Sequence, residues 1–197
     1  NLAVSLGEIV TAAFAVFGSG TIADAGGDLQ TFIVERLRGY LRDAGYTANE
    51  IESVLCRELP ARLDQIPLQL SAVRAFASLP EAASLAAANK RAGNILRKEG
   101  VTGVKPADAA LLLKDDAEKV LAKTVASIRS NVDAHYDRKE YVDCLKTLAS
   151  LKGPVDSFFD EVMVNVEDVQ VRNNRLALLS ELCYLMNRVA DISKLAA

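Results

Sequence analysis

The chain has 197 residues, of which half are hydrophobic and a quarter are charged. This composition supports one or two folded domains with a sizeable core and argues against a disordered chain. Its 30 Ala and 26 Leu residues are strong helix formers, whereas Gly and Pro number only 11 and 5, so we expect an all-α fold. The formal charge of −3 excludes wholesale electrostatic capture of nucleic acid but allows a local basic patch.

Several other classes of function are also disfavoured. The longest early uncharged run, Ile9–Ala23, is shorter than the ~20 residues of a spanning helix, and no basic stretch precedes it. We therefore expect no membrane segment and no signal peptide. The three cysteines form no C-x-x-C motif, which predicts a reduced, cytoplasmic compartment and no metal site. His135 is the only histidine, which leaves little material for a Ser-His-Asp triad.

The first third of the chain contains helix and turn signals. Helix is predicted over 7–17 and a loop over 18–27, where Gly18-Ser19-Gly20 lacks the following Lys-Ser/Thr of a phosphate-binding loop. Asp28 can cap a helix that runs to about Ala44. Thr47 and Glu50 form a capping box for a helix to about Glu58, which Pro60 ends. The chain begins at Asn1 rather than Met, and we expect it to be a piece of a longer protein.

The remaining two thirds predict further helices. Pro67 suits the first turn of a helix to Ser78, and a break at 101–106 marks a plausible domain boundary. Asp137 can cap a helix to Leu151, which Lys152-Gly153-Pro154 would stop. The other predicted helices cover residues 81–99, 108–113, 115–134, 154–163 and 168–189.

The helix over 81–99 has the most informative pattern. Its first half is almost all Ala, which allows close helix packing. Its second half is polar and basic, and residues 82–98 carry a formal charge of +4 with no acid. Lys90, Asn94 and Arg97 are spaced by four and three residues, so they share one face.

Three stretches together resemble one family. They are Phe32–Arg42 with the following Gly45-Tyr46-Thr47; Leu85–Lys98; and Pro154–Val164 with Glu167-Asp168 and Val171–Leu179. Paired Phe residues, flanking acids and an Arg-x-x-Arg helix start at this spacing make the third stretch the most specific. Together they resemble the C-terminal part of the β subunit of bacterial heterotetrameric glycyl-tRNA synthetase, over nearly the whole chain.

The resemblance implies a domain organisation and a role. Residues 1–60 would be the end of a preceding helical domain, and 61–197 a helical anticodon-binding domain like that of arginyl-tRNA synthetase. The parent enzyme would use ATP and Mg to attach glycine to its tRNA, as an α2β2 assembly whose α subunit holds most of the aminoacylation site. This chain would supply tRNA recognition, with no catalytic site and no contact with DNA or membrane.

Anticodon bases are read by stacking and by hydrogen bonds to their edges, while cations hold the phosphates. Glycine anticodons share two cytosines, and Asn and Arg side chains can pair with cytosine edges or phosphate oxygens. The predicted tRNA-binding residues lie on two helices: Asn89, Lys90, Arg91, Asn94, Arg97 and Lys98 on one, and Arg172 and Asn173 at the start of another.

Structural interpretations compete with these assignments. Arg97 and Lys98 suit any helix C-terminus, and the paired Phe158 and Phe159 are typical of core. We expect Arg175 to form an ion pair with one of the nearby acids Asp160, Glu161, Glu167 and Asp168. The alternative function is a helical scaffold that docks a protein partner such as the α subunit, which would bury or scatter the basic residues. An independent helical hydrolase is disfavoured because no nucleophile, base and metal set is visible.

Overall fold

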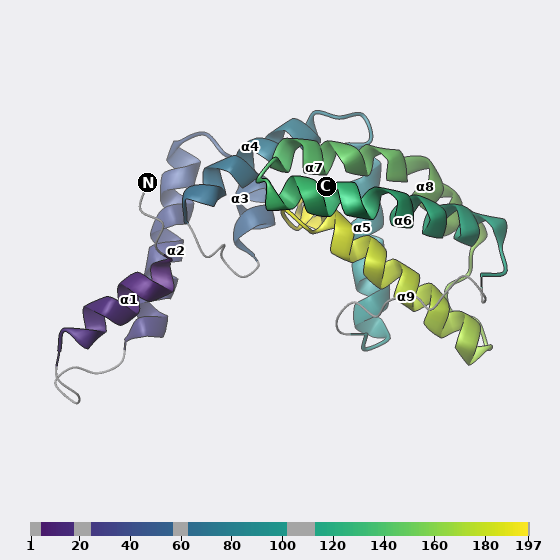
Figure 1. Ribbon diagram of the computed structural model, residues 1–197, viewed down its shortest axis with the longest axis horizontal. Coiled ribbons are helices and arrows are strands. Elements are labelled where there is room, and N and C mark those ends of the chain that lie inside the picture. The colour runs from purple at the N-terminus through teal and green to yellow at the C-terminus, as the bar shows by residue number, and fades with distance from the viewer. Residues whose placement is uncertain (1–4, 18–24, 57–62, 102–112, 197) are drawn as a thin grey trace.

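The computed structural model describes residues 5–17, 25–56, 63–101 and 113–196 (Figure 1). Every regular element in these ranges is helical, which confirms the all-α prediction. The α-helices are α1 (Leu6–Ala15), α2 (Gly26–Asp43), α3 (Ala48–Leu55), α4 (Ile66–Ala77), α5 (Ala82–Lys98), α6 (Asp116–Asp137), α7 (Tyr141–Thr147), α8 (Lys152–Glu161) and α9 (Val169–Met186). Short 3-10 turns are η1 (Leu63–Gln65), η2 (Leu148–Leu151) and η3 (Ile192–Leu195).

Capping boxes start helices where the sequence has a short polar side chain followed three residues later by Glu. The predicted box at Thr47 is present: its hydroxyl accepts from the Glu50 N–H, and the Glu50 carboxylate accepts from the Thr47 N–H at 2.7 Å. Ser5 and Glu8 form the same arrangement at α1. Asp168, the first residue of the helix predicted over 168–189, caps α9 and accepts from the backbone N–H of Gln170 at 3.0 Å. These bonds satisfy amide groups that have no partner within the helix.

Three predicted helix boundaries are wrong. Asp28 lies in the first turn of α2 rather than at its cap, because that helix already begins at Gly26. Asp137 is the last residue of α6, and α7 begins after Glu140, with Lys139 between them at a φ of 61°. Residues 152–154 start α8 rather than ending a helix, since a Pro in the first helical turn needs no N–H partner.

Some predictions fall outside the described residues. They are most of the loop over 18–27, the break at 101–106, the short helix at 108–113 and the helix end at Pro60.

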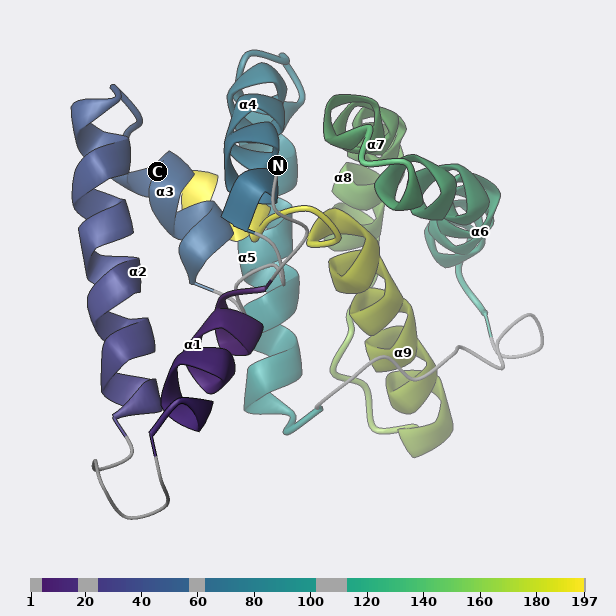
Figure 2. The ribbon, with the colours of Figure 1, turned by 60° about the vertical axis from the view of Figure 1, so that its left-hand side comes forward.

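Helix α5 crosses the middle of the molecule, with α9 beside it (Figure 2). Its inner side is made of small and aliphatic residues at three- and four-residue spacing, Leu85, Ala88, Ala92 and Leu96. The alanines let neighbouring backbones approach closely, as the sequence predicts. Helix α6 packs along α7, α8 and α9 and completes the bundle.

The C-terminal turn η3 packs against both α3 and α5. The Asp191 N–H donates to the Ser53 carbonyl at 2.7 Å, and the Gln69 amide donates to the Val189 carbonyl at 3.1 Å. Ile51 and Leu55 of α3 therefore belong to the same hydrophobic core as the helices that follow. A domain boundary near residue 60 stays a prediction, and α3 shares its core with the second predicted domain.

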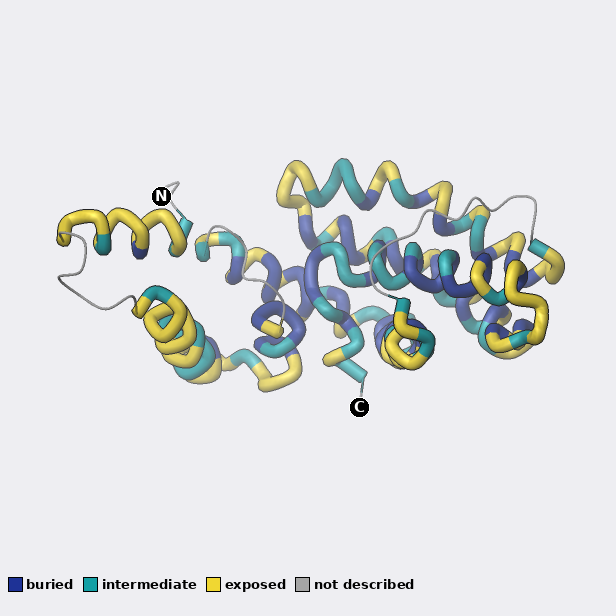
Figure 3. The backbone as a smooth tube through the Cα atoms, turned by 90° about the horizontal axis from the view of Figure 1, so that it is seen from below, coloured by how far each residue is buried: buried dark blue, intermediate teal, exposed yellow. Residues whose placement is uncertain are grey.

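Helices α1 and α2 lie at one end of the molecule and are mostly exposed (Figure 3). Each has one buried hydrophobic residue, Val10 and Leu41 respectively. Larger apolar side chains, including Phe32 and Tyr40, are exposed. This end contributes little to the described core.

The ion pair between Glu50 and Arg74 joins α3 to α4 and makes a testable prediction. The Arg74 guanidinium donates to both carboxylate oxygens, at 2.8 and 3.0 Å, and holds the pKa of Glu50 at about 2, below its usual 4.5. A carboxylate with a lowered pKa stabilises the fold above pH 4.5, and this contribution is lost as the pH falls toward 2. We expect Glu50→Gln to lower the free energy of unfolding by roughly 2 kcal/mol at pH 7, allowing for the half-exposed Arg74.

More than half of this difference in the free energy of unfolding between wild type and Glu50→Gln should be lost at pH 3. Urea unfolding at pH 7 and pH 3 measures it. Glu52→Gln is the matched control, since the Glu52–Arg38 pair is more exposed and is expected to cost less than about 1 kcal/mol. An equal destabilisation by Glu50→Gln at pH 7 and pH 3 would contradict this account.

Candidate nucleic-acid interface

The second half of α5 presents a row of cations to solvent. Lys90, Arg97 and Lys98 are exposed, and the Arg97 guanidinium donates to the Asn94 side-chain oxygen at 3.3 Å. We call Lys90, Arg91, Asn94, Arg97 and Lys98 the α5 basic face. Cations in the last turn also suit the helix dipole, so the position of Arg97 and Lys98 is favourable even without a ligand.

No ion pair in the described part of the chain involves any cation of the α5 basic face. Several cations elsewhere do form ion pairs: Arg188 contacts Asp133 at 3.2 Å, and Lys152 contacts Asp156 at 2.6 Å. The described acids thus form no ion pair that would neutralise the charge of the α5 basic face. Such a surface attracts anions, phosphates among them.

Asn89 does not belong to this surface. Its side chain is 2% exposed, donates to the Asn187 side-chain oxygen at 2.7 Å and accepts from the Asn187 amide at 3.2 Å. This pair joins α5 to the end of α9, so we remove Asn89 from the predicted tRNA-binding set. Its spacing of four from Leu85 and three from Ala92, both buried, was the signal that it faces the core.

Arg91 lies over the ring of Phe159, with its guanidinium carbon 4.4 Å from the ring centroid. Phe159 in turn packs edge-to-face against Phe158, with a centroid separation of 5.5 Å. The core prediction is confirmed for Phe158, which is fully buried, but Phe159 is only half-buried. The aromatic pair therefore anchors one cation of the α5 basic face.

The segment 162–168, which connects α8 to α9, links the two predicted binding helices. The Asn165 amide donates to the Glu99 carboxylate at the end of α5, at 3.3 Å. The Arg172 guanidinium donates to the Val166 carbonyl, also at 3.3 Å. Arg172 is half-buried and Asn173 is exposed. This one segment thus contacts both the end of α5, through Asn165, and the start of α9, through Val166.

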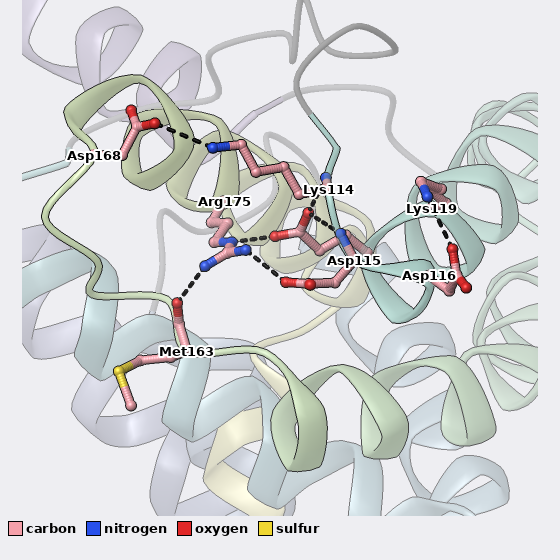
Figure 4. A network of polar contacts seen from close by, with 8 residues as sticks. Lys114, Asp115, Asp116, Lys119, Met163, Asp168 and Arg175 are labelled. Atoms are coloured by element: carbon pink, nitrogen blue, oxygen red, sulfur yellow. Dashed lines mark hydrogen bonds and ion pairs between the residues drawn. The ribbon is translucent and has the colours of Figure 1, made fainter.

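A buried network fixes that segment (Figure 4). The Arg175 guanidinium donates to the Met163 carbonyl at 2.6 Å, to the Asp115 carboxylate at 2.6 Å and to the Glu118 carboxylate. The Arg175 side chain is 6% exposed and that of Glu118 is fully buried. Glu118 also accepts from the backbone N–H groups of Lys114 and Asp115, at 2.8 and 3.2 Å.

The prediction that Arg175 forms an ion pair is confirmed, but the predicted partners are wrong. The observed partners, Glu118 and Asp115, lie 57 and 60 positions earlier in the chain, at the start of α6. Asp168 instead accepts from the Val171 N–H and contacts Lys114, and both interactions lower the pKa of the Asp168 carboxyl. The capping-box spacing of Asp115 and Glu118 could have predicted that these two acids lie close together at the start of α6.

A pocket with a volume of about 440 Å³ opens between the second half of α5 and the end of α8. This volume is within the roughly 300–1,000 Å³ of ligand sites. Arg91, Ile95 and Lys98 line one side, and Phe159 and Met163 line the other. Polar lining residues are Glu99, Asp160, Glu161 and Asn165.

Other reactive groups have structural surroundings. Burial raises the pKa of the Cys144 and Cys183 thiols to about 12, which keeps them protonated. His135 lies in the last turn of α6, with its Nδ1 2.7 Å from Glu140. Among the described residues, no cluster of three or more His, Cys, Asp or Glu side chains is arranged to hold a metal ion. None of the described helices is long and apolar enough to cross a membrane.

Comparison with known families identifies the domain. The sequence profile of the DALR anticodon binding domain matches residues 85–192, from α5 to η3. The chain belongs to the DALR anticodon binding domain family. The match includes the α5 basic face, the segment 162–168 and the whole Arg175 network.

Curated relatives match over a wider range. The chain is 49% identical over 198 residues to the glycine–tRNA ligase beta subunit of Thiobacillus denitrificans and 50% identical over 199 residues to that of Ralstonia nicotianae. Both alignments cover 100% of this chain and 28% of the relative. The beta subunit of Nitrosomonas europaea is 53% identical over 171 residues, which are 87% of this chain and 24% of that protein. The chain thus spans less than a third of the length of these relatives.

The Arg175 network makes the second prediction. Arg175→Met removes the cation but keeps an unbranched side chain. The Glu118 carboxylate then stays buried without its cationic partner. Breaking a buried pair in this way is expected to lower the free energy of unfolding by roughly 3–5 kcal/mol, measured by urea unfolding. Arg97→Met makes the same substitution at an exposed cation and should change stability by less than about 0.5 kcal/mol. Equal costs for the two variants would contradict a structural role for Arg175.

Proposed function

We propose that this chain binds the anticodon arm of glycine tRNA through the α5 basic face, assisted by Arg172 and Asn173. The observation that carries the proposal is that the family match contains a surface of cations on one side of α5 that form no ion pair with the residues the structure describes. The names of the relatives support glycine tRNA as the specific partner.

The geometry suits a single-stranded loop. Lys90, Arg97 and Lys98 would hold backbone phosphates, because exposed cations that form no ion pair with the described residues can displace the counterions condensed on the RNA. Asn94 and Asn173 offer both donors and acceptors to base edges. Arg172, oriented by the Val166 carbonyl, would contact the RNA from the other side of segment 162–168.

The proposed parent is a glycine–tRNA ligase beta subunit that works with an α subunit in an α2β2 assembly in the cytoplasm. The whole enzyme would attach glycine to its tRNA with ATP and Mg. This chain would contribute recognition rather than chemistry, and we assign no residue of it to catalysis, to ATP or to a metal.

The alternative is a scaffold that docks the α subunit or another protein. The exposed apolar side chains of α2, such as Phe32 and Tyr40, favour a protein contact at that end. The basic residues favour RNA at the other end, because those of α5 are exposed, and segment 162–168 contacts both Glu99 at the end of α5 and Arg172 of α9. The two contacts are compatible within one subunit.

The α5 basic face makes the third prediction. The triple variant Lys90→Ala, Arg97→Ala and Lys98→Ala should weaken binding to a glycine tRNA transcript. It should also reduce the slope of log K against log salt concentration by about 2–3, the value for three lost phosphate contacts. Fluorescence anisotropy at several salt concentrations measures both quantities.

A matched control removes the same charge from α6 and α7 through Lys119→Ala, Lys123→Ala and Lys146→Ala, all at exposed positions. Its salt slope should fall by less than about 1. If the two triple variants bind alike, the α5 basic face is not the RNA-binding surface and the scaffold alternative is favoured.

A further inference from the structure

The pocket beside α5 has features of a site for a single unstacked nucleobase. We infer that Arg91 and Phe159 form a stacking platform for one cytosine of the anticodon, and that Glu99 reads the amino group of that base. This inference rests on the proposed function and adds a base-specific contact to it.

The stacking platform consists of side chains that pack one on another from the core to the surface. Phe158 is fully buried, and its ring supports Phe159 edge-to-face. The Phe159 ring supports the Arg91 guanidinium at 4.4 Å. Arg91 is exposed and forms no ion pair with the described residues, so its outer face is open to a ligand. Guanidinium planes and aromatic rings are both surfaces on which unstacked RNA bases pack.

The rim of the pocket carries groups that suit a nucleotide. Lys98 lines the same pocket and can contact the phosphate of the stacked nucleotide. Glu99 follows the last residue of α5, and the Asn165 amide holds one of its carboxylate oxygens at 3.3 Å. No described residue donates to the second oxygen, which can therefore accept a hydrogen bond from the base.

A carboxylate acceptor selects for a base with an exocyclic amino group. Cytosine presents an N4 amino donor that pairs with Glu or Asp, whereas uracil presents a carbonyl oxygen at the same position. Two other acids, Asp160 and Glu161, also line the pocket. Glu99 is the acid that a neighbouring amide orients, and we therefore assign the contact to it.

The stacking role is tested with Phe159→Leu and Arg91→Lys in the full chain. Leu keeps an apolar contact with Phe158, and Lys keeps the charge while removing the planar group. Each variant should bind an anticodon stem-loop of glycine tRNA about 5- to 100-fold more weakly, as expected for one lost stacking contact. The salt slope should not change, because neither variant loses a charge.

The reading role is tested with Glu99→Gln. If the Gln side-chain oxygen keeps the Asn165 contact, its amide nitrogen faces the base and donates to uracil rather than accepting from cytosine. Wild type should prefer cytosine over uracil by about 5- to 100-fold at one of the two anticodon cytosines. In Glu99→Gln this preference should disappear or reverse at that position and stay unchanged at the other.

The outcomes separate this inference from the proposed function. Thermal unfolding identifies variants that fail to fold, and Arg91→Lys tests the platform if Phe159→Leu is one of them. Normal binding by a folded Arg91→Lys variant, or an unchanged cytosine preference in Glu99→Gln, would overturn the base pocket. The α5 triple variant would still report on tRNA binding. A chain that binds no stem-loop at all would overturn both.

Discussion

The Arg175 guanidinium joins three segments that are distant in sequence: α9, the start of α6 and the chain after α8. Removing its charge from water is costly, and the structure offsets this cost with two carboxylates and one carbonyl. Because Met163 is held in this way, the following residues Asn165 and Val166 reach Glu99 and Arg172. The arrangement of the candidate interface therefore depends on one buried cation that does not itself face solvent.

A chain with a net negative charge can still bind RNA when its cations are distributed unevenly. Cations such as Arg129, Lys152 and Arg188 are matched with acids of the same bundle. Those of α5 are not matched within the described residues, although the other side of the same helix is buried in the core. One helix thus combines a structural side with a side suited to phosphates.

Local patterns in the sequence predicted much of the fold. The capping box at Thr47, the start of the last long helix near Asp168 and the extent of α5 needed only neighbouring residues, and the structure confirms them. The acidic partners of Arg175 and the partner of Asn89 were not predictable in this way, because each lies more than fifty positions away. Phe159 was assigned to the core because a pattern of paired aromatics does not show which ring reaches the surface.

The central claim is that this chain itself recognises the anticodon, and one comparison tests it directly. Its affinity is measured for a glycine tRNA transcript and for the same transcript with both anticodon cytosines replaced, at two salt concentrations. The account predicts weaker binding to the altered tRNA at both, with the same salt dependence, because base contacts are lost and phosphate contacts are kept. Equal affinity for the two transcripts would contradict it and reduce the α5 basic face to a clamp on the RNA backbone.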